Sequence, residues 1–278
     1  MVRINREPLK KVKTFIQQNK PKCFVSNIAN GSIVMCTSRS PDKLTCNEDA
    51  AAVIPVTNES SVFVIADGAG GMRGGEQASA LAINTLISSI QQSLKDNIDL
   101  RDAILNGIEL ANANVMALGI GAATTISVVE QVGNTIRTYY VGDSEIIVMG
   151  QRGRIIHQTI PHSPVGYALE AGFIDVDDAL HHAERHLVSN LLGSAEMHIA
   201  IGPTITLSKF DTILLSSDGL TDNFPVEHIV NTVRKGRLSA SVRKLFKQTL
   251  EHMQPAEETA SYKADDLSII AFRPYHIK

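Results

Sequence analysis

The sequence predicts an α+β fold in which antiparallel sheets pack on each other and helices cover their outer faces. Segments typical of strands come in groups, and pairs of segments with helical periodicity separate these groups. Neighbouring strand segments are joined by short turns such as Gly133-Asn134 and Gly142-Asp143, which favour hairpins over crossover connections. Residues 62–66 are apolar throughout, which indicates a strand that is buried on both faces.

The individual elements follow from hydrophobic periodicity. Strands are expected at residues 32–36, 50–56, 61–66, 123–131, 135–141, 145–150, 154–158, 205–207, 212–216 and 267–272. Apolar residues repeat at helical spacing over residues 76–95, 100–116, 225–235 and 239–253. Residues 161–192 fit neither period and hold four of the nine histidines, so we expect a partly helical insertion at the edge of the main body.

Residues 1–22 form a basic N-terminal extension, in which Leu9, Val12, Phe15 and Ile16 are spaced for one helical face. This spacing leaves two interpretations open, a short amphipathic helix docked on the body and a frayed end. Residues 23–278 contain no internal repeat and no low-complexity linker. We therefore predict that they form a single domain.

Composition narrows the class of protein. The 278 residues are 44% hydrophobic and 20% charged, with a net charge of −3, which argues against binding to nucleic acid or to an acidic membrane. No apolar run approaches the ~20 residues that span a bilayer, and no secretory signal is recognisable, so we expect a cytoplasmic protein. Cys23, Cys36 and Cys46 lack CxxC spacing, which predicts reduced thiols, with neither a disulfide framework nor a zinc site.

Carboxylates stand beside apolar runs at five separate strand edges. They are Glu48 and Asp49, Asp67, Asp143, Asp218, and Asp265 with Asp266. A single aspartate there is usually a turn former, but several brought together repel one another unless cations are present. Oxygen ligands suit Mg²⁺ or Mn²⁺, and Ca²⁺ stays open, while a flanking glycine such as Gly68 lets the backbone approach a metal. Two such ions can activate a water and neutralise a phosphate, and the sequence predicts a cluster for hard metal ions around Asp67, Asp218 and Asp265.

Two other kinds of site are less well supported. The glycine-rich residues 68–75 follow a strand and open a helix, as nucleotide-binding loops do. They lack Gly-Lys-Ser/Thr, and Arg73 stands where the third glycine of GxGxxG belongs. His182 and His186 would share a helix face suited to zinc, but Ala183 replaces the glutamate of HExxH, so a polar, exposed helix is the preferred interpretation.

Six short segments, taken in chain order, resemble the metal-dependent protein phosphatases of the type 2C (PPM) family, particularly the compact bacterial kind. They are N-E-D at 47–49, D-G-A-G-G at 67–71, G-A-A-T-T at 121–125, G-D-S at 142–144, S-D-G-L-T-D at 217–222 and D-D-L-S at 265–268. The resemblance implies an αββα sandwich and a monomer. It also implies hydrolysis of phosphoserine and phosphothreonine in proteins, in opposition to a serine/threonine kinase.

The resemblance further implies a role for each acid. The ions would be Mn²⁺ or Mg²⁺, two of them with room for a third, and a metal-bridging hydroxide would attack phosphorus in line. Asp49, Asp67 and Asp218 are the expected catalytic residues. Asp67 would bridge two metals, and the Gly68 carbonyl would bind the second of them. Asp218 and Asp265 would bind the first metal, while Glu48 and Asp49 would bind metals directly or through waters. Asp143 together with Asp218 would hold the third metal. Residues 161–192 would form the family's flap beside the substrate groove.

The chain departs from the family pattern at the phosphate-binding position. Leu44 stands where members often carry an arginine, so Lys43 and Arg39 become the candidates for phosphate binding. This departure keeps an alternative open, a catalytically weak relative that acts as a binding or regulatory module. The other departures are Ala69 in the D-G-x-G-G loop, Glu145 after G-D-S and Asp266 after the last metal aspartate.

Overall fold

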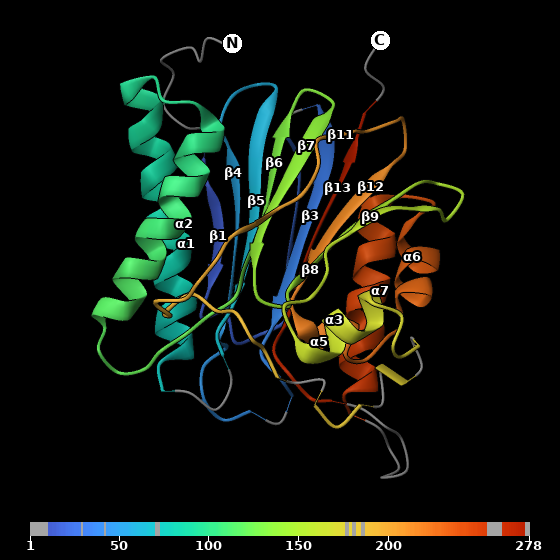
Figure 1. Cartoon of the computed structure of the whole chain (residues 1–278). Coiled ribbons are helices and arrows are strands. Elements are labelled where there is room, and N and C mark those ends of the chain that lie inside the picture. Colours follow the sequence, from blue (N-terminus) through green and yellow to red (C-terminus); the bar gives the residue numbers. More distant parts are fainter. Residues whose placement is uncertain are drawn as a thin grey trace.

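The computed structural model describes residues 11–28, 30–41, 43–69, 73–175, 178–179, 182–184, 187–254 and 263–275. Two antiparallel sheets face each other, and helices lie on the outer side of each sheet (Figure 1). The predicted α+β sandwich is confirmed. Within the described part of the chain, no helix is both long and apolar enough to cross a membrane.

The first sheet runs in the order β1-β4-β5-β6-β7-β10, with β11 also paired to β7. Its strands are β1 (Lys13–Ile16), β4 (Asp49–Pro55), β5 (Ser60–Asp67), β6 (Ile126–Val132), β7 (Thr135–Val141), β10 (Ala200–Ile201) and β11 (Ile205–Thr206). The second sheet runs in the order β2-β3-β13-β12-β8-β9. Its strands are β2 (Lys22–Ile28), β3 (Gly31–Ser38), β13 (Leu267–Pro274), β12 (Thr212–Ser216), β8 (Glu145–Met149) and β9 (Ile155–Gln158).

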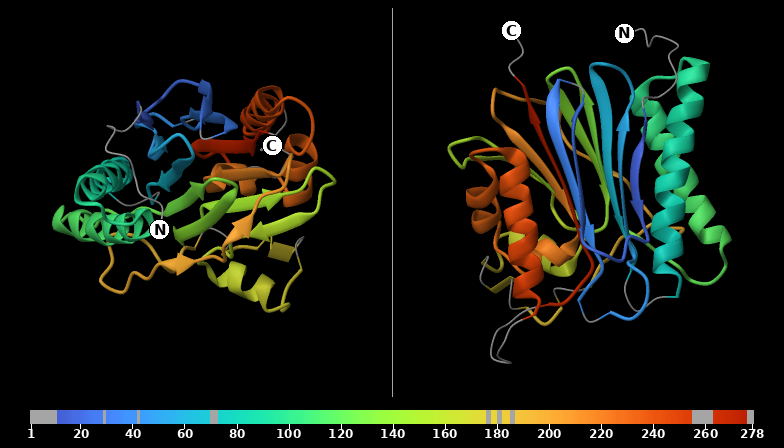
Figure 2. Two further views of the ribbon diagram at one scale, coloured as in Figure 1. Left: turned by 90° about the horizontal axis from the view of Figure 1, so that it is seen from above. Right: turned by 180° about the vertical axis from the view of Figure 1, so that it is seen from behind.

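Helices α1 (Gly75–Asp96) and α2 (Leu100–Ala117) cover the first sheet, and α6 (Val226–Val233) and α7 (Leu238–His252) cover the second (Figure 2). These four helices confirm the four predicted helical segments. Two short helices, α3 (Pro164–Glu170) and α5 (Asp218–Thr221), lie at the lower end of the sandwich in Figure 1.

Strand β5 shows why its sequence is apolar without interruption. Phe63 and Ile65 point between the sheets, where the Phe63 ring lies 5.2 Å from that of Phe272 in β13. Val62 and Val64 point the other way, into the layer shared with α1 and α2. Because successive side chains of a strand alternate between faces, a strand with a sheet on one side and helices on the other needs apolar residues at every position.

The N-terminal extension differs from its expected form. Residues 13–16 form β1, which pairs with β4 and places Phe15 in the core between the sheets with 4% of its surface exposed. Both earlier interpretations, a helix and a frayed end, are wrong for these four residues. Backbone pairing with the edge of β4 makes these residues a strand, and the helical spacing of their apolar side chains gives no information about that pairing. Leu9 lies outside the described residues.

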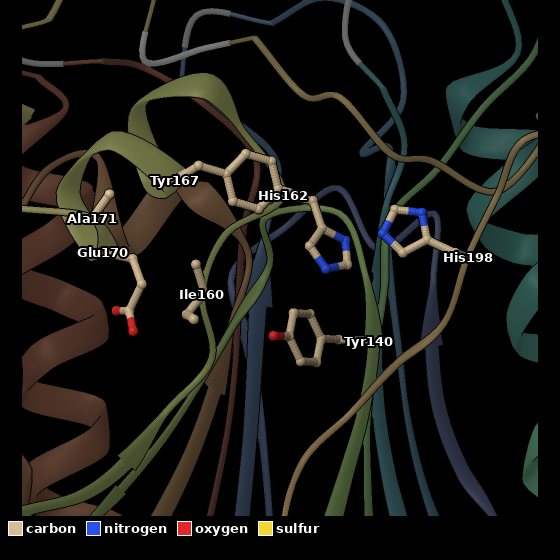
Figure 3. A pocket seen from close by; sticks show the side chains of 7 residues that line it. All are labelled: Tyr140, Ile160, His162, Tyr167, Glu170, Ala171 and His198. Atoms are coloured by element: carbon tan, nitrogen blue, oxygen red, sulfur yellow. The ribbon is translucent and has the colours of Figure 1, made fainter.

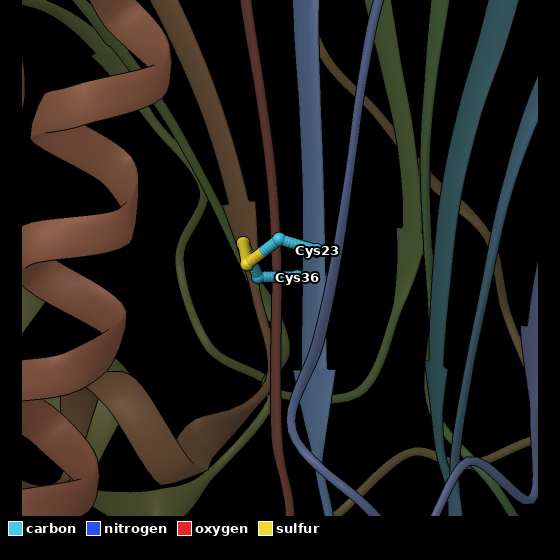
Figure 4. Close-up of a disulfide and its surroundings, with 2 residues drawn as sticks. All are labelled: Cys23 and Cys36. Atoms are coloured by element: carbon cyan, nitrogen blue, oxygen red, sulfur yellow. A yellow bond between two sulfur atoms is a disulfide. The ribbon is translucent and has the colours of Figure 1, made fainter.

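The prediction of three reduced thiols is also wrong. Cys23 and Cys36 are direct partners across β2 and β3, and they form a disulfide on the face toward α7 (Figure 4). Residues opposite each other on antiparallel strands lie close enough to be bridged. The register of the hairpin creates this proximity, and CxxC spacing carries no information about it. Cys46 is a free thiol, as predicted, and its side chain is exposed.

Candidate metal centre

The predicted acids come together at one end of the sandwich, because the strands that carry them begin or end there. Asp49 opens β4 and Asp67 closes β5, and the two are direct partners in the ladder. Asp218 follows β12, and Asp265 precedes β13, its antiparallel neighbour. Asp143 lies in the turn between β7 and β8. Both sheets therefore contribute carboxylates to the same edge.

The carboxylates lie close enough to change one another's pKa. Part of the Asp67 side chain stays accessible, yet burial raises its pKa well above the ordinary value, and Asp49, Asp218, Asp265 and Asp143 add to the shift. Crowded carboxylates at low dielectric favour the protonated form unless cations compensate. The centre is therefore built to attract positive charge.

The same crowding raises the pKa of Asp143, in the turn that joins the two sheets, and of Asp265, just before β13. Burial, and then the charges of Asp218 and Asp222, raise the pKa of Asp143 to about 8. Burial and Asp218 raise the pKa of Asp265 to about 6, against the opposing effect of Lys263. Asp67, Asp49, Asp218, Asp265 and Asp143 therefore form one electrostatic cluster.

Asp49 has a buried oxygen with no protein partner in the described structure. The side chain is 2% exposed, and its Oδ2 accepts a 2.8 Å hydrogen bond from Ser217 Oγ. Its Oδ1 is buried and accepts no hydrogen bond. Burial and the charge of Asp266 raise the pKa of Asp49. An unpartnered buried oxygen costs free energy, and a bound cation would satisfy it.

Lys43 carries an ammonium into the cluster from the loop before β4. It pairs with Glu48 and lies 2.6 Å from Asp266 Oδ2. Asp266 also accepts backbone hydrogen bonds from Ser40 at 2.8 Å and Glu48 at 2.7 Å. Burial lowers the pKa of Lys43, but the bonds to Asp266 and Glu48 outweigh it, so its pKa is raised overall. The extra charge of Asp266 is therefore compensated within the chain.

Lys263 brings a second ammonium that the sequence did not predict. Its Nζ lies 2.5 Å from Asp218 Oδ2, 2.7 Å from Asp222 Oδ2 and 3.2 Å from Asp265 Oδ2. Burial lowers its pKa, and the charges of these three carboxylates outweigh that effect and raise it. The only hint in the sequence was that Lys263 stands two residues before Asp265, and a lysine at that position does not indicate a contact unless the fold is known.

These residues fit divalent cations in chemistry. All donors are carboxylate or carbonyl oxygens, and Asp49 Oδ1 lacks a partner. Gly68 packs so closely that an added Cβ would lie 2.4 Å from the Gly75 carbonyl, and its N–H donates to the Glu48 carbonyl at 3.1 Å. Across the described ranges, no three Asp, Glu, His or Cys side chains are already spaced as a ready-made metal cage. Lys43 pairs with Glu48 and Asp266, and Lys263 pairs with Asp218, Asp222 and Asp265.

The remaining predicted residues lie at the margin of the cluster or outside the described residues. The Arg39 side chain donates to the Thr45 carbonyl at 3.1 Å, within its own loop. Leu44 is 96% exposed and contributes no charge to the centre. Gly70, Gly71 and His186 lie outside the described residues. His182 Nδ1 accepts from the backbone N–H of Glu184.

A cavity of about 330 Å³ has aromatic side chains in its lining, His162 among them (Figure 3). It is lined by Tyr140, Ile160, His162, Tyr167, Glu170, Ala171 and His198. His162 Nδ1 accepts hydrogen bonds from the Gly142 N–H at 3.1 Å and from Asn190 at 2.9 Å. Burial, then the charge of His198, lowers the pKa of His162 to about 4. A neutral imidazole therefore supports the turn that carries Asp143.

The arrangement agrees with similarities to known proteins. A family model for protein phosphatase 2C matches residues 39–265. The protein phosphatase PhpP of Streptococcus pneumoniae is 29% identical over 169 residues, which cover 58% of this chain and 68% of PhpP. The serine/threonine phosphatase Stp of Listeria welshimeri is 26% identical over 202 residues, covering 69% of this chain and 79% of Stp.

Solved structures show the same architecture. The PPM Ser-Thr phosphatase MsPP of Mycobacterium smegmatis has a TM-score of 0.72 and 25% identity, with coverage of 87% of this chain and 98% of MsPP. The catalytic domain of the phosphatase PstP in complex with 2 manganese ions has a TM-score of 0.69 and covers 92% of this chain and 100% of its own. At 20% identity, the second similarity supports the fold alone. The chain belongs to the protein phosphatase 2C family and is a protein serine/threonine phosphatase.

Proposed function

We propose that the chain hydrolyses phosphoserine and phosphothreonine in proteins with water activated by two divalent ions, Mn²⁺ or Mg²⁺, at the acidic centre. The observation that carries the proposal is the set of carboxylates from both sheets at one edge, with a buried Asp49 oxygen left unpartnered. When bound, such ions lower the pKa of water and neutralise the phosphate under attack. Metal dependence is general in this family, and one structural neighbour was solved with manganese.

The residues that would hold these ions are those at the converging strand ends. They are Asp67 with the Gly68 carbonyl, Asp218, Asp265, Asp49, Glu48 and, at the margin, Asp143. Ser217 fixes the Asp49 carboxylate by donating to Oδ2, which leaves Oδ1 for a cation. Asp49, Asp67 and Asp218 remain the proposed catalytic residues.

Phosphate binding falls to the loop before β4 in this proposal. Lys43 already reaches the acidic centre and keeps 21% of its side chain exposed, so its ammonium can turn toward a phosphate oxygen. Arg39 is the second candidate on the same loop. Lysine offers a point charge in place of the bidentate fork of arginine, which would weaken the grip on phosphate.

The wider expectations stay predictions. They are a single domain over residues 23–278 with a flap at 161–192, a monomer, a cytoplasmic location, and a phosphoprotein substrate that a serine/threonine kinase modifies. Within the flap range, α3 (Pro164–Glu170) is described and lines the aromatic cavity.

A metal titration of enzyme activity tests the proposal. We expect hydrolysis of p-nitrophenyl phosphate to require Mn²⁺ or Mg²⁺, to stop with chelator, and to fall at least ~100-fold in Asp218→Asn. Asp102→Asn, an exposed carboxylate on α2, is the matched control and should keep wild-type activity. Equal turnover with and without chelator would overturn the proposal.

A weak phosphatase that acts as a binding module is the second candidate, because Leu44 leaves the usual arginine position without a cation. The same experiment separates the two. Binding of a phosphothreonine peptide without turnover at saturating Mn²⁺ would favour the binding module.

A further inference from the structure

The turn between β1 and β2, residues 17–21, contacts the loop that carries Glu48 and Asp49. The backbone N–H of Asn47, directly before these two acids, donates to Asn19 Oδ1 at 2.8 Å. We propose that Asn19 is a positioning residue of the acidic centre, which acts through Asn47 and raises the affinity of the centre for divalent ions. The inference rests on the proposed metal-dependent function and names a residue that precedes the part of the chain matched by the family model.

The side chain of Asn47 fixes the backbone of Asp49. Asn47 is buried, and its Oδ1 accepts a hydrogen bond from the Asp49 N–H at 2.8 Å. Its Nδ2 donates to the Gln18 carbonyl at 3.0 Å and to Thr37 Oγ1 at 3.2 Å. Because both amide protons and the amide oxygen have partners, the side chain is held in one orientation. The position of the Asp49 backbone therefore depends on the position of Asn47.

The turn that carries Asn19 is itself anchored to both sheets. Ile16, the last residue of β1, pairs with Ala50, the second residue of β4 in the first sheet. Lys22, the first residue of β2, pairs with Thr37 in the second sheet. The turn therefore passes from one sheet to the other at the end where the acids converge. Because a strand ladder fixes each of its ends, the turn is a firm support for the loop before β4.

The hydrogen bond from Asn47 links this support to metal binding. Asn19 is exposed, so its substitution removes no core packing, but it removes the acceptor for an N–H of a buried residue. The loop then loses an anchor, and Glu48 and Asp49 would have to be ordered when metal binds. The free energy of that ordering weakens binding. Hydrogen-bonded neighbours that orient metal ligands raise metal affinity for this reason.

The affinity of metal-stripped protein for Mn²⁺, measured by isothermal titration calorimetry, tests the proposal. We expect Asn19→Ala to weaken Mn²⁺ binding by ~3- to 10-fold, less than the loss of a direct partner of a metal ligand, because Asn19 acts through Asn47. Asn19→Asp keeps an acceptor oxygen and should bind Mn²⁺ at least as tightly as the wild type. Gln18→Ala is the matched control. It removes the side chain that donates to the Lys20 carbonyl within the same turn, keeps the backbone carbonyl that accepts from Asn47, and should bind Mn²⁺ like the wild type.

Equal Mn²⁺ affinity in Asn19→Ala and wild type would overturn the inference and leave the metal-dependent function standing. A wild type that binds no Mn²⁺ would overturn the proposed function itself. Thermal unfolding in chelator separates positioning from stability: an Asn19→Ala protein that unfolds at a lower temperature but binds Mn²⁺ as tightly as the wild type has lost stability only, which also contradicts the inference. Weakened Mn²⁺ binding in Asn19→Asp would contradict it too, because that variant keeps the acceptor.

Discussion

The role of Asp266 in the structure differs from the one that its sequence position suggests. Judged by sequence, it is a departure from the family pattern that adds a negative charge beside Asp265. In the fold, its carboxylate accepts from the Ser40 and Glu48 backbone and pairs with Lys43, which is 223 positions away. Lys43 and Asp266 together therefore organise the loop before β4. No local pattern announces such a pair, because it depends on which strand ends meet.

Glu145, another departure from the family, is a buried carboxylate with one polar partner. Its Oε2 accepts from Gln158 Nε2 at 2.8 Å, and burial, followed by the charge of Asp222, raises its pKa to about 7. The unfolded chain releases this proton near pH 4.5, whereas the folded chain holds it until about pH 7. The stability that it contributes is therefore present at low pH and lost as pH rises through this window.

The substitution Glu145→Gln removes the titrating carboxyl group, so the loss of folding stability with rising pH should disappear. In metal-free protein we expect the variant to be more stable than wild type at pH 8 by on the order of 2 kcal/mol, with little difference at pH 4.5. Urea unfolding at several pH values measures this directly. A stability difference that does not change with pH would show that the buried charge of Glu145 is not the cause.

At the scale of elements, the sequence predicted the helices and strands that hydrophobic periodicity determines. It missed the strands and the disulfide that depend on pairing between strands. The helices α1, α2, α6 and α7 and the fully apolar β5 follow from their own residues. The strands β1 and β2 did not, because β1 is short and edge-paired and β2 alternates weakly. The disulfide was missed for the same reason, since the β2–β3 register alone places Cys23 opposite Cys36.

The disulfide joins residues 13 positions apart, so it restricts a short loop of the unfolded chain. Reduction should lower the free energy of unfolding by about 2 to 4 kcal/mol, the usual range for native disulfides. Denaturant unfolding with and without a thiol reductant measures the change. Cys23→Ser, which cannot form the bond, is the control and should not respond to reductant. Titration of three free thiols in the unreduced, unfolded protein would contradict the assignment.

At the scale of the whole molecule, the acidic centre exists only because two sheets end at one edge. Asp49 and Asp67 come from the first sheet, and Asp218 and Asp265 come from the second. The order of motifs along the chain was enough to predict this assembly from the family resemblance. Lys43 was predicted as a candidate for phosphate binding, but its pairing with Asp266 was not, and Lys263 was not predicted at all, because these contacts join distant segments of the chain.

The most direct test of the central claim is phosphate release from a phosphothreonine peptide by metal-stripped wild-type protein, followed before and after Mn²⁺ is restored. The account predicts no release above background without metal and sustained release with it. Release at the same rate in the presence of chelator, or no release at saturating Mn²⁺, would contradict a metal-dependent protein phosphatase centre built on Asp67, Asp218 and Asp265.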